Sequence, residues 1–340
     1  MNAEVAKKTL MARKRIDSGD RYYIYNEAAE DSYKKEYSYV EPAKRLLRFS
    51  ADIVGTLSDC YLLYAVAYLG VTDRTTIQLF LKNIKTRNPR LYIEDPEDDD
   101  NVMNRLGFLA KAGFLFIHNY YAHDYTEEKE GAYARRLYTI DREGCTLLNQ
   151  KLSKNVPYNA WIQAKSLNEL IAWASGAYIG AFLSTDRNFS EYLDGVFRNR
   201  FMGAYYFPCE LKFVVGDVPA YVAIETSYLY FDDRSMTQDD YDNARVRKIN
   251  AIKNYILGRS KKGPAYAVIV VQDNEDLMKM AELISQTGVL EELLERIYFT
   301  GEGAVRTKSS LQDAFLQLVR VDENGDRTMD FVIKHPDFLS

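Results

Sequence analysis

Two glutamates and a lysine, Glu210, Glu225 and Lys248, lie on neighbouring predicted elements where their carboxylates and amine can meet. Glu225 ends the segment AYVAIE, whose nearly continuous apolar run predicts a central strand within residues 218–228. Glu210 lies on the preceding predicted strand, and Lys248 lies on the following predicted helix, on one face with Arg245. Taken by itself, this pattern predicts an ordinary strand-end carboxylate at Glu225, paired with Arg245 or Lys248.

Motifs for several other chemistries are missing from the sequence. The three cysteines and three histidines are scattered, whereas a structural zinc site needs four clustered ligands. The histidines of HNYYAH (residues 118–123) have four residues between them, whereas replication initiators of the HUH type need two histidines flanking one apolar residue. Neither a GxxxxGK[ST] phosphate loop nor a GxSxG nucleophile elbow occurs.

The first half of the chain is predicted to run helix, helix, helix, strand, turn, strand, helix. The third helix starts at the acidic run 97–100 and ends in LGFLAKAGFL, and the second strand ends in RRLYTID. This order resembles the winged helix-turn-helix, a family of DNA-binding modules. The elements are expected at residues 58–69, 73–85, 97–113, 114–121, 133–140 and 142–152.

The resemblance implies that the third helix enters the major groove and that the hairpin contacts the DNA backbone. Asparagine and arginine can pair bidentately with adenine and guanine edges. The acidic residues 97–100 oppose this use because they repel phosphate, so a winged helix that contacts protein remains an alternative. The candidate DNA-binding residues are Asn101, Asn104, Arg105 and Lys111 on the helix, with Arg135 and Arg136 on the second hairpin strand.

The second half of the chain reads α-β-β-β-α-β, which looks similar to the core of PD-(D/E)XK nucleases. In active members of that fold, two carboxylates hold Mg²⁺ and a strand lysine orients the attacking water. The resemblance assigns Glu210 and Glu225 as metal ligands and catalytic residues, but Ser227 stands at the lysine position. Lys248 on the following helix is the candidate to replace that lysine, as the third catalytic residue.

The whole layout resembles the replication-relaxation family of mobile genetic elements over most of residues 50–300. Members of that family join a winged helix-turn-helix to a nuclease-like domain, whose acidic strand end is followed by a helix of the form K-x6-Y. Here Glu225 is the strand end, and Lys248 and Tyr255 stand at that spacing. The resemblance implies a role in DNA replication or transfer on a plasmid, phage or conjugative element.

The expected fold class is α/β (α+β) in two domains. We expect an N-terminal arm at 1–41, a winged helix-turn-helix domain at 42–156 and a restriction-endonuclease-like domain at 157–340. The net charge of −5 argues against a protein that coats nucleic acid by bulk charge. The longest apolar run, 60–70, is too short to span a bilayer, and the scattered cysteines favour a reducing cytoplasm.

The favoured function is duplex DNA binding, with a nuclease-like domain that does not cleave and needs no cofactor. One alternative is an active nuclease with Mg²⁺ at Glu210 and Glu225; another is an adaptor that binds only proteins. Replication or transfer proteins are expected as further partners and a membrane is not, while self-association is left open.

Overall fold

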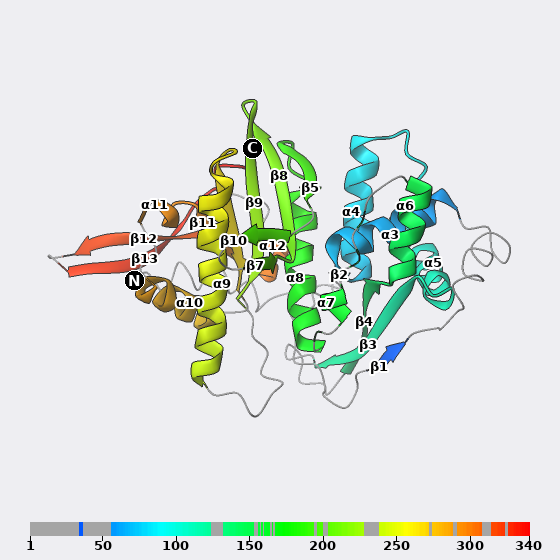
Figure 1. Cartoon of the computed structure of the whole chain (residues 1–340), viewed down its shortest axis with the longest axis horizontal. Helices are drawn as coiled ribbons and strands as arrows, with labels where there is room; N and C mark the ends of the chain where they lie inside the picture. The colour runs from blue at the N-terminus through cyan, green and yellow to red at the C-terminus, as the bar shows by residue number, and fades with distance from the viewer. Residues whose placement is uncertain are drawn as a thin grey trace. The chain divides into compact units, whose positions relative to one another are not determined.

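The computed structural model describes most of the chain after residue 55. The described residues are 34–36, 56–123, 132–152, 156, 158, 160–163, 165, 167–193, 196–199, 203–227, 238–271, 274–287, 291–307, 314–323 and 326–340. The predicted N-terminal arm, apart from 34–36, and most of the predicted hairpin turn lie outside them. The chain is a mixed α/β protein (Figure 1). Among the described helices, none is both long and apolar enough to cross a membrane.

Two compact units divide the chain between Thr185 and Asp186. The first unit contains a four-stranded antiparallel sheet in the order β1-β3-β4-β2. Helix α8 packs on β2, α4, α3 and β4, so it belongs to this unit, although the expected domain boundary precedes it. Its elements are β1 (Lys34–Glu36), α3 (Leu57–Leu69), β2 (Val71–Thr72), α4 (Arg74–Arg87), α5 (Asp99–Lys111), β3 (Leu115–His123), β4 (Ala132–Ile140), α6 (Arg142–Leu152), α7 (Ala160–Gln163) and α8 (Leu167–Leu183).

Local chemistry sets the helix ends of this unit. The Thr56 hydroxyl accepts from the Asp59 backbone N–H at 3.3 Å, and the Asp59 carboxylate accepts from the Thr56 backbone N–H at 2.7 Å. This reciprocal capping box starts α3. Helix α4 starts at Asp73, whose carboxylate accepts from the Thr76 backbone N–H.

The second unit is built on a seven-stranded mixed sheet in the order β13-β12-β11-β10-β9-β8-β5. Strands β9, β10 and β11 are parallel, and helices connect them: α9 joins β9 to β10, and α10 and α11 join β10 to β11. The elements are β5 (Phe189–Leu193), β6 (Val196–Asn199), β7 (Gly203–Tyr206), β8 (Cys209–Val215), β9 (Val218–Thr226), α9 (Gln238–Arg259), β10 (Ala265–Val270), α10 (Asn274–Gln286), α11 (Glu291–Leu294), β11 (Ile297–Thr300), α12 (Glu302–Thr307), β12 (Leu316–Glu323) and β13 (Asp326–Ile333).

Both faces of the seven-stranded sheet are packed with apolar side chains. On one face, α9 and α10 bury their apolar sides against alternating residues of β9 and β10, such as Ala223 and Ile269 (Figure 1). On the other face, the ring of Phe338 lies 5.1 Å from the ring of Phe213 and 5.4 Å from that of Tyr266, measured between ring centroids. Because α9 packs against β9, the inward-facing side chains of α9 contact any polar side chain that the strands present on this face of the sheet.

Glycine substitutions test the packing of the first unit. Gly70 ends α3 with φ +72°, and a Cβ there would lie 3.0 Å from Trp173 Nε1 and 3.1 Å from Ile162 Cδ1. We expect Gly70→Ala to lower the free energy of unfolding by about 1–2 kcal/mol, since the left-handed backbone disfavours a side chain.

Gly107 in α5 is the matched control, because a Cβ there would meet no atom within 4 Å. Gly107→Ala should raise the free energy of unfolding by up to about 1 kcal/mol, the gain in helix propensity. Urea unfolding followed by circular dichroism measures both changes. A shift of the same sign in the two variants would contradict the assignment of Gly70 as a constrained helix end.

Candidate functional site

Helix α9 presents three cationic or phenolic side chains to two buried carboxylates of the sheet. Lys248, Tyr255 and Arg259 stand at i, i+7 and i+11, so they share the face of α9 that lies on β8 and β9. Glu210 pairs with Ala223 in the antiparallel register of β8 and β9. Since Glu225 follows two residues after Ala223, both carboxylates point from the same face of the sheet toward α9.

Glu225 is held by donors from three directions. Its side chain is only 4% exposed, and its carboxylate accepts from the Tyr205 hydroxyl at 2.7 Å and from the Thr226 backbone N–H at 2.9 Å. The Lys248 ammonium lies 3.3 Å from the same carboxylate and also donates to the Thr226 carbonyl oxygen. The expectation that Glu225 pairs with Arg245 or Lys248 is therefore confirmed, with Lys248 as the partner.

Glu210 is fully buried and has a separate set of partners. Tyr255 donates its hydroxyl to Glu210 Oε1 at 2.9 Å, and Arg259 Nη2 lies 2.7 Å from Oε1 and 2.9 Å from Oε2. The Arg259 guanidinium also lies 5.4 Å from the centroid of the Tyr221 ring. A buried carboxylate without such partners would carry a desolvation penalty of several kcal/mol, and these contacts offset that cost for Glu210.

The two phenols stay protonated because of where they lie. Burial raises the pKa of Tyr205 well above its ordinary value of 10.0, and the neighbouring Glu225 raises it further. Burial likewise raises the pKa of Tyr255 well above 10.0, with the charge of Glu210 acting in the same direction. Each phenol therefore acts as a fixed donor to its carboxylate at neutral pH.

Ser227 stands at the position where the nuclease resemblance places a lysine. Its hydroxyl is within hydrogen-bond distance of the Val270 carbonyl oxygen, at 3.0 Å, and of the Asp276 carboxylate on α10. Asp276 in turn accepts from Arg245 Nη2 at 3.3 Å, and Arg245 Nη1 lies 3.6 Å from Asp242. Ser227 thus joins β9 to β10, α9 and α10 and faces no open space, since it is fully buried.

The residues present do not fit a Mg²⁺ site of the nuclease type. Mg²⁺ demands near-octahedral oxygen coordination, but the oxygens of Glu210 and Glu225 already accept from an arginine, a lysine and two tyrosines. Lys212 lies two residues after Glu210 on β8, and its Nζ pairs with Glu191 Oε1 on β5 at 2.8 Å. Among the described residues, no three acidic, histidine or cysteine side chains are grouped in a way that could hold a metal ion.

The predicted DNA-binding residues of α5 fall into two groups. Arg105, predicted to contact DNA, instead donates from Nε to Asp59 Oδ1 at 2.7 Å and from Nη2 to Asp59 Oδ2. The Asp59 side chain is 1% exposed, so Arg105 compensates a buried charge. Asn101 donates to Glu94 at 2.6 Å and is half-buried. Asn104 and Lys111 are exposed.

The hairpin holds the remaining two candidates. Arg136 is exposed on β4, and its Nε lies 3.1 Å from Asn119 Oδ1 on β3. Tyr138, two residues later and therefore on the same face of the hairpin, contacts the Met103 sulfur on α5. Arg136 thus lies on the face of the hairpin that α5 covers. The side chain of Arg135 lies outside the described residues.

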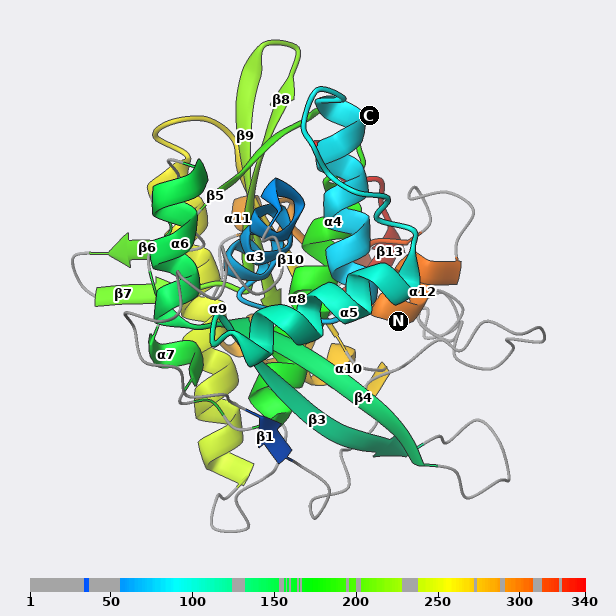
Figure 2. The ribbon, with the colours of Figure 1, turned by 90° about the vertical axis from the view of Figure 1, so that its right-hand side faces the viewer.

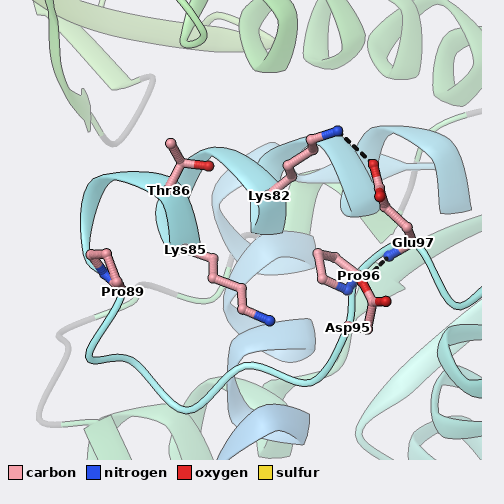
Figure 3. Close-up of a pocket in the computed structure, with 7 residues that line it drawn as sticks. All are labelled: Lys82, Lys85, Thr86, Pro89, Asp95, Pro96 and Glu97. Atoms are coloured by element: carbon pink, nitrogen blue, oxygen red, sulfur yellow. Dashed lines mark hydrogen bonds and ion pairs between the residues drawn. The ribbon is translucent and has the colours of Figure 1, made fainter.

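Cations of α4 partly neutralise the acidic start of α5, a feature that the sequence reasoning missed. Arg74 lies 3.2 Å from Asp99, and Lys82 lies 2.5 Å from Glu97. The second pair borders a pocket of about 350 Å³ between α4 and the loop before α5 (Figure 3). Its lining mixes both charges: Lys82, Lys85, Thr86, Pro89, Asp95, Pro96 and Glu97.

Removing one phenol tests the role of the tyrosine–carboxylate pairs. We expect Tyr255→Phe to lower the free energy of unfolding by about 1–3 kcal/mol at pH 7, since Glu210 loses a buried donor. The raised pKa of Tyr255 means that its contribution is fully present below pH 10.0 and is lost as pH rises through the pKa of the folded state. The gap between wild type and variant should therefore shrink at high pH.

Urea unfolding from pH 7 to about pH 11 measures this gap. Tyr92, 62% exposed, provides the control, and Tyr92→Phe should change the free energy of unfolding little at any pH. A Tyr255→Phe gap that stays constant across the range would show that the phenol ionises equally in the folded and unfolded states.

Comparison with known proteins does not assign this chain to a family. No protein-family model matches the chain, and no curated protein matches it. Membership of the replication-relaxation family therefore stays a prediction. The contacts of Glu210, Glu225 and α5 are the features on which a function for this chain rests.

Proposed function

We propose that this chain binds duplex DNA through a winged helix-turn-helix in the first unit, and that the second unit assists without cleaving DNA. The short strand β2 carries this proposal. It lies between α3 and α4 and pairs with β4, with Val71 opposite Thr139, which gives the strand order β3-β4-β2. A winged helix-turn-helix has the same element order and the same three-stranded sheet, with the third helix as its recognition helix.

The free face of α5 supports this assignment. Asn104, Gly107 and Lys111 stand at i, i+3 and i+7, opposite the buried stripe of Val102, Leu106 and Leu109. Figure 2 shows α5 beside the β3–β4 hairpin, whose Arg136 can reach the DNA backbone from the same side. An exposed asparagine, a position without a side chain and a lysine form a surface that can approach the floor of a groove.

The paired acids at the start of α5 lessen the charge objection to DNA binding. Asp99 and Glu97 are paired with Arg74 and Lys82, so the repulsion of phosphate is smaller than the sequence suggests. Asp98 and Asp100 remain exposed. The α5 surface is therefore better suited to recognising bases than to attracting the phosphate backbone. Its contribution to the salt dependence of DNA binding should be modest.

The second unit supports a role without catalysis. Both candidate metal ligands, Glu210 and Glu225, are occupied by protein donors, and the lysine position is a buried serine. An α/β unit of this kind can bind DNA or partner proteins without cleaving DNA. In the second unit the sheet strands β5, β8 and β9 are followed by α9 and β10, which is the β-β-β-α-β part of the nuclease order, whereas the helix expected to open that order, α8, belongs to the first unit. This partial order and the element order of the first unit support the resemblance to replication and transfer proteins of mobile elements, and we propose that setting.

A charge series at Gly107 tests the DNA-facing role of α5. A side chain there meets no atom of the protein within 4 Å of its Cβ, so different residues fit without repacking. We expect duplex affinity at low salt to fall in the order Gly107→Lys, Gly107→Gln, Gly107→Glu. The carboxylate should weaken binding at least about tenfold relative to glutamine, because like charges at an interface cost several kcal/mol.

Fluorescence anisotropy with labelled duplexes measures these affinities, and the glutamine variant controls for side-chain size. The differences should narrow as salt rises, since screening weakens exposed charge interactions. Equal affinity of the lysine and glutamate variants would exclude α5 as the DNA-facing helix. No binding by the wild type at low salt would favour the adaptor alternative.

Plasmid integrity tests the non-catalytic role of the second unit. We expect supercoiled plasmid to stay intact with wild-type protein and either Mg²⁺ or Mn²⁺, because the carboxylates are already bound by protein donors. Gel electrophoresis of the plasmid after incubation is the readout. Metal-dependent nicking that disappears in Glu225→Gln would establish the nuclease alternative instead.

A further inference from the structure

Helix α9 and the turn after it carry a strong local excess of positive charge. Residues 243–263 contain seven lysines and arginines and no carboxylate, although the chain as a whole has a net charge of −5. The inward cations Arg245, Lys248 and Arg259 neutralise buried carboxylates. The other four, Arg247, Lys253, Lys261 and Lys262, have no such role.

These four residues form what we call the α9 basic surface. Arg247, Lys261 and Lys262 are exposed and Lys253 is half-buried. Among the described residues, no ion pair joins any of the four to a carboxylate. Asn250 and Asn254 lie between them on the helix, and the Asn254 amide donates to the Asn250 carbonyl oxygen.

The turn that carries Lys261 and Lys262 is held in place. The Lys262 backbone N–H donates to the Arg259 carbonyl oxygen at 2.8 Å, and Arg296 Nη1 donates to the Ser260 hydroxyl at 2.8 Å. Gly263 lies so close to β9 that a Cβ there would be 2.1 Å from the Pro219 carbonyl oxygen. A fixed turn presents its cations at lower entropic cost than a free loop.

The helix dipole does not account for this arrangement. Cations near a helix C-terminus are stabilising, but the effect falls off within the last turn. Arg247 and Lys253 lie more than one turn before the end of α9 at Arg259. Their placement on the outward side leaves them available to a partner outside the protein.

We infer that the α9 basic surface is a second contact for the phosphate backbone of duplex DNA. From Arg247 to Lys261 the chain runs for about 21 Å at the helical rise. Duplex DNA presents about one negative charge per 1.7 Å of its axis, so several phosphates lie along that length. Amides such as that of Asn250 can add hydrogen bonds to phosphate oxygens. Asp239, Asp240 and Asp242 confine the surface to the later turns of α9.

This inference rests on the proposed DNA binding but assigns a different surface in the other unit. Its test is the triple variant Lys253→Gln/Lys261→Gln/Lys262→Gln of the full chain. Anisotropy with a duplex of arbitrary sequence gives the slope of log affinity against log salt concentration. We expect that slope to become shallower by about 0.9 for each lost contact, and so by about 2 to 3 in all.

The control is Arg187→Gln/Arg320→Gln/Lys334→Gln, which removes three exposed cations from other parts of the same unit. It should leave the slope almost unchanged, and thermal unfolding checks that both triple variants fold. Equal slopes for the wild type and the α9 variant would overturn the inference. So would loss of binding to anionic lipid vesicles together with unchanged DNA affinity.

The Gly107→Glu background separates this inference from the proposed function. If α5 and the α9 basic surface both contact DNA, the two sets of changes weaken binding independently, and the double variant binds weakest. If only the α9 changes matter, the winged-helix proposal fails and the inference stands. If only the Gly107 changes weaken binding, the inference about the α9 basic surface fails and the winged-helix proposal stands.

Discussion

The rotation of α9 about its own axis is the constraint on which the second unit depends. Two carboxylates, Glu210 and Glu225, are buried in the sheet, and moving an ionised carboxylate from water into the interior costs several kcal/mol even after relaxation. Lys248, Tyr255 and Arg259 offset that cost only when their side of α9 faces β8 and β9. These contacts therefore fix the rotation of α9 about its axis, and that rotation determines which of its other side chains face the solvent.

The first unit uses the same device on α5. Asp59 caps α3 from its first turn and lies buried, so it needs a cation, and Arg105 supplies one from α5. That ion pair turns α5 so that Asn104 and Lys111 face outward. In both units a buried carboxylate sets which residues of a neighbouring helix remain free for a partner. Three of the residues predicted as DNA or metal ligands, Arg105, Glu210 and Glu225, therefore have their partners within the protein.

Much of the secondary structure follows from the sequence, because long periodic segments such as α3 and the β3–β4 hairpin carry their own signal. Strand β2 has two residues and no period, so only its pairing with β4 reveals it. The pair of Glu225 with Lys248 was predictable as one alternative, since a strand end and the next helix often meet. The bond of Ser227 to Asp276 was not, because it joins residues 49 positions apart and leaves no local pattern.

Ser227 fills the position at which the nuclease resemblance would place a lysine. Here the small hydroxyl lets β9, β10, α9 and α10 close on one another through Asp276 and Arg245. Ser227 is fully buried in this contact. The inward cations of α9 pair with buried carboxylates, so any attraction of this helix for phosphate must come from its outward cations.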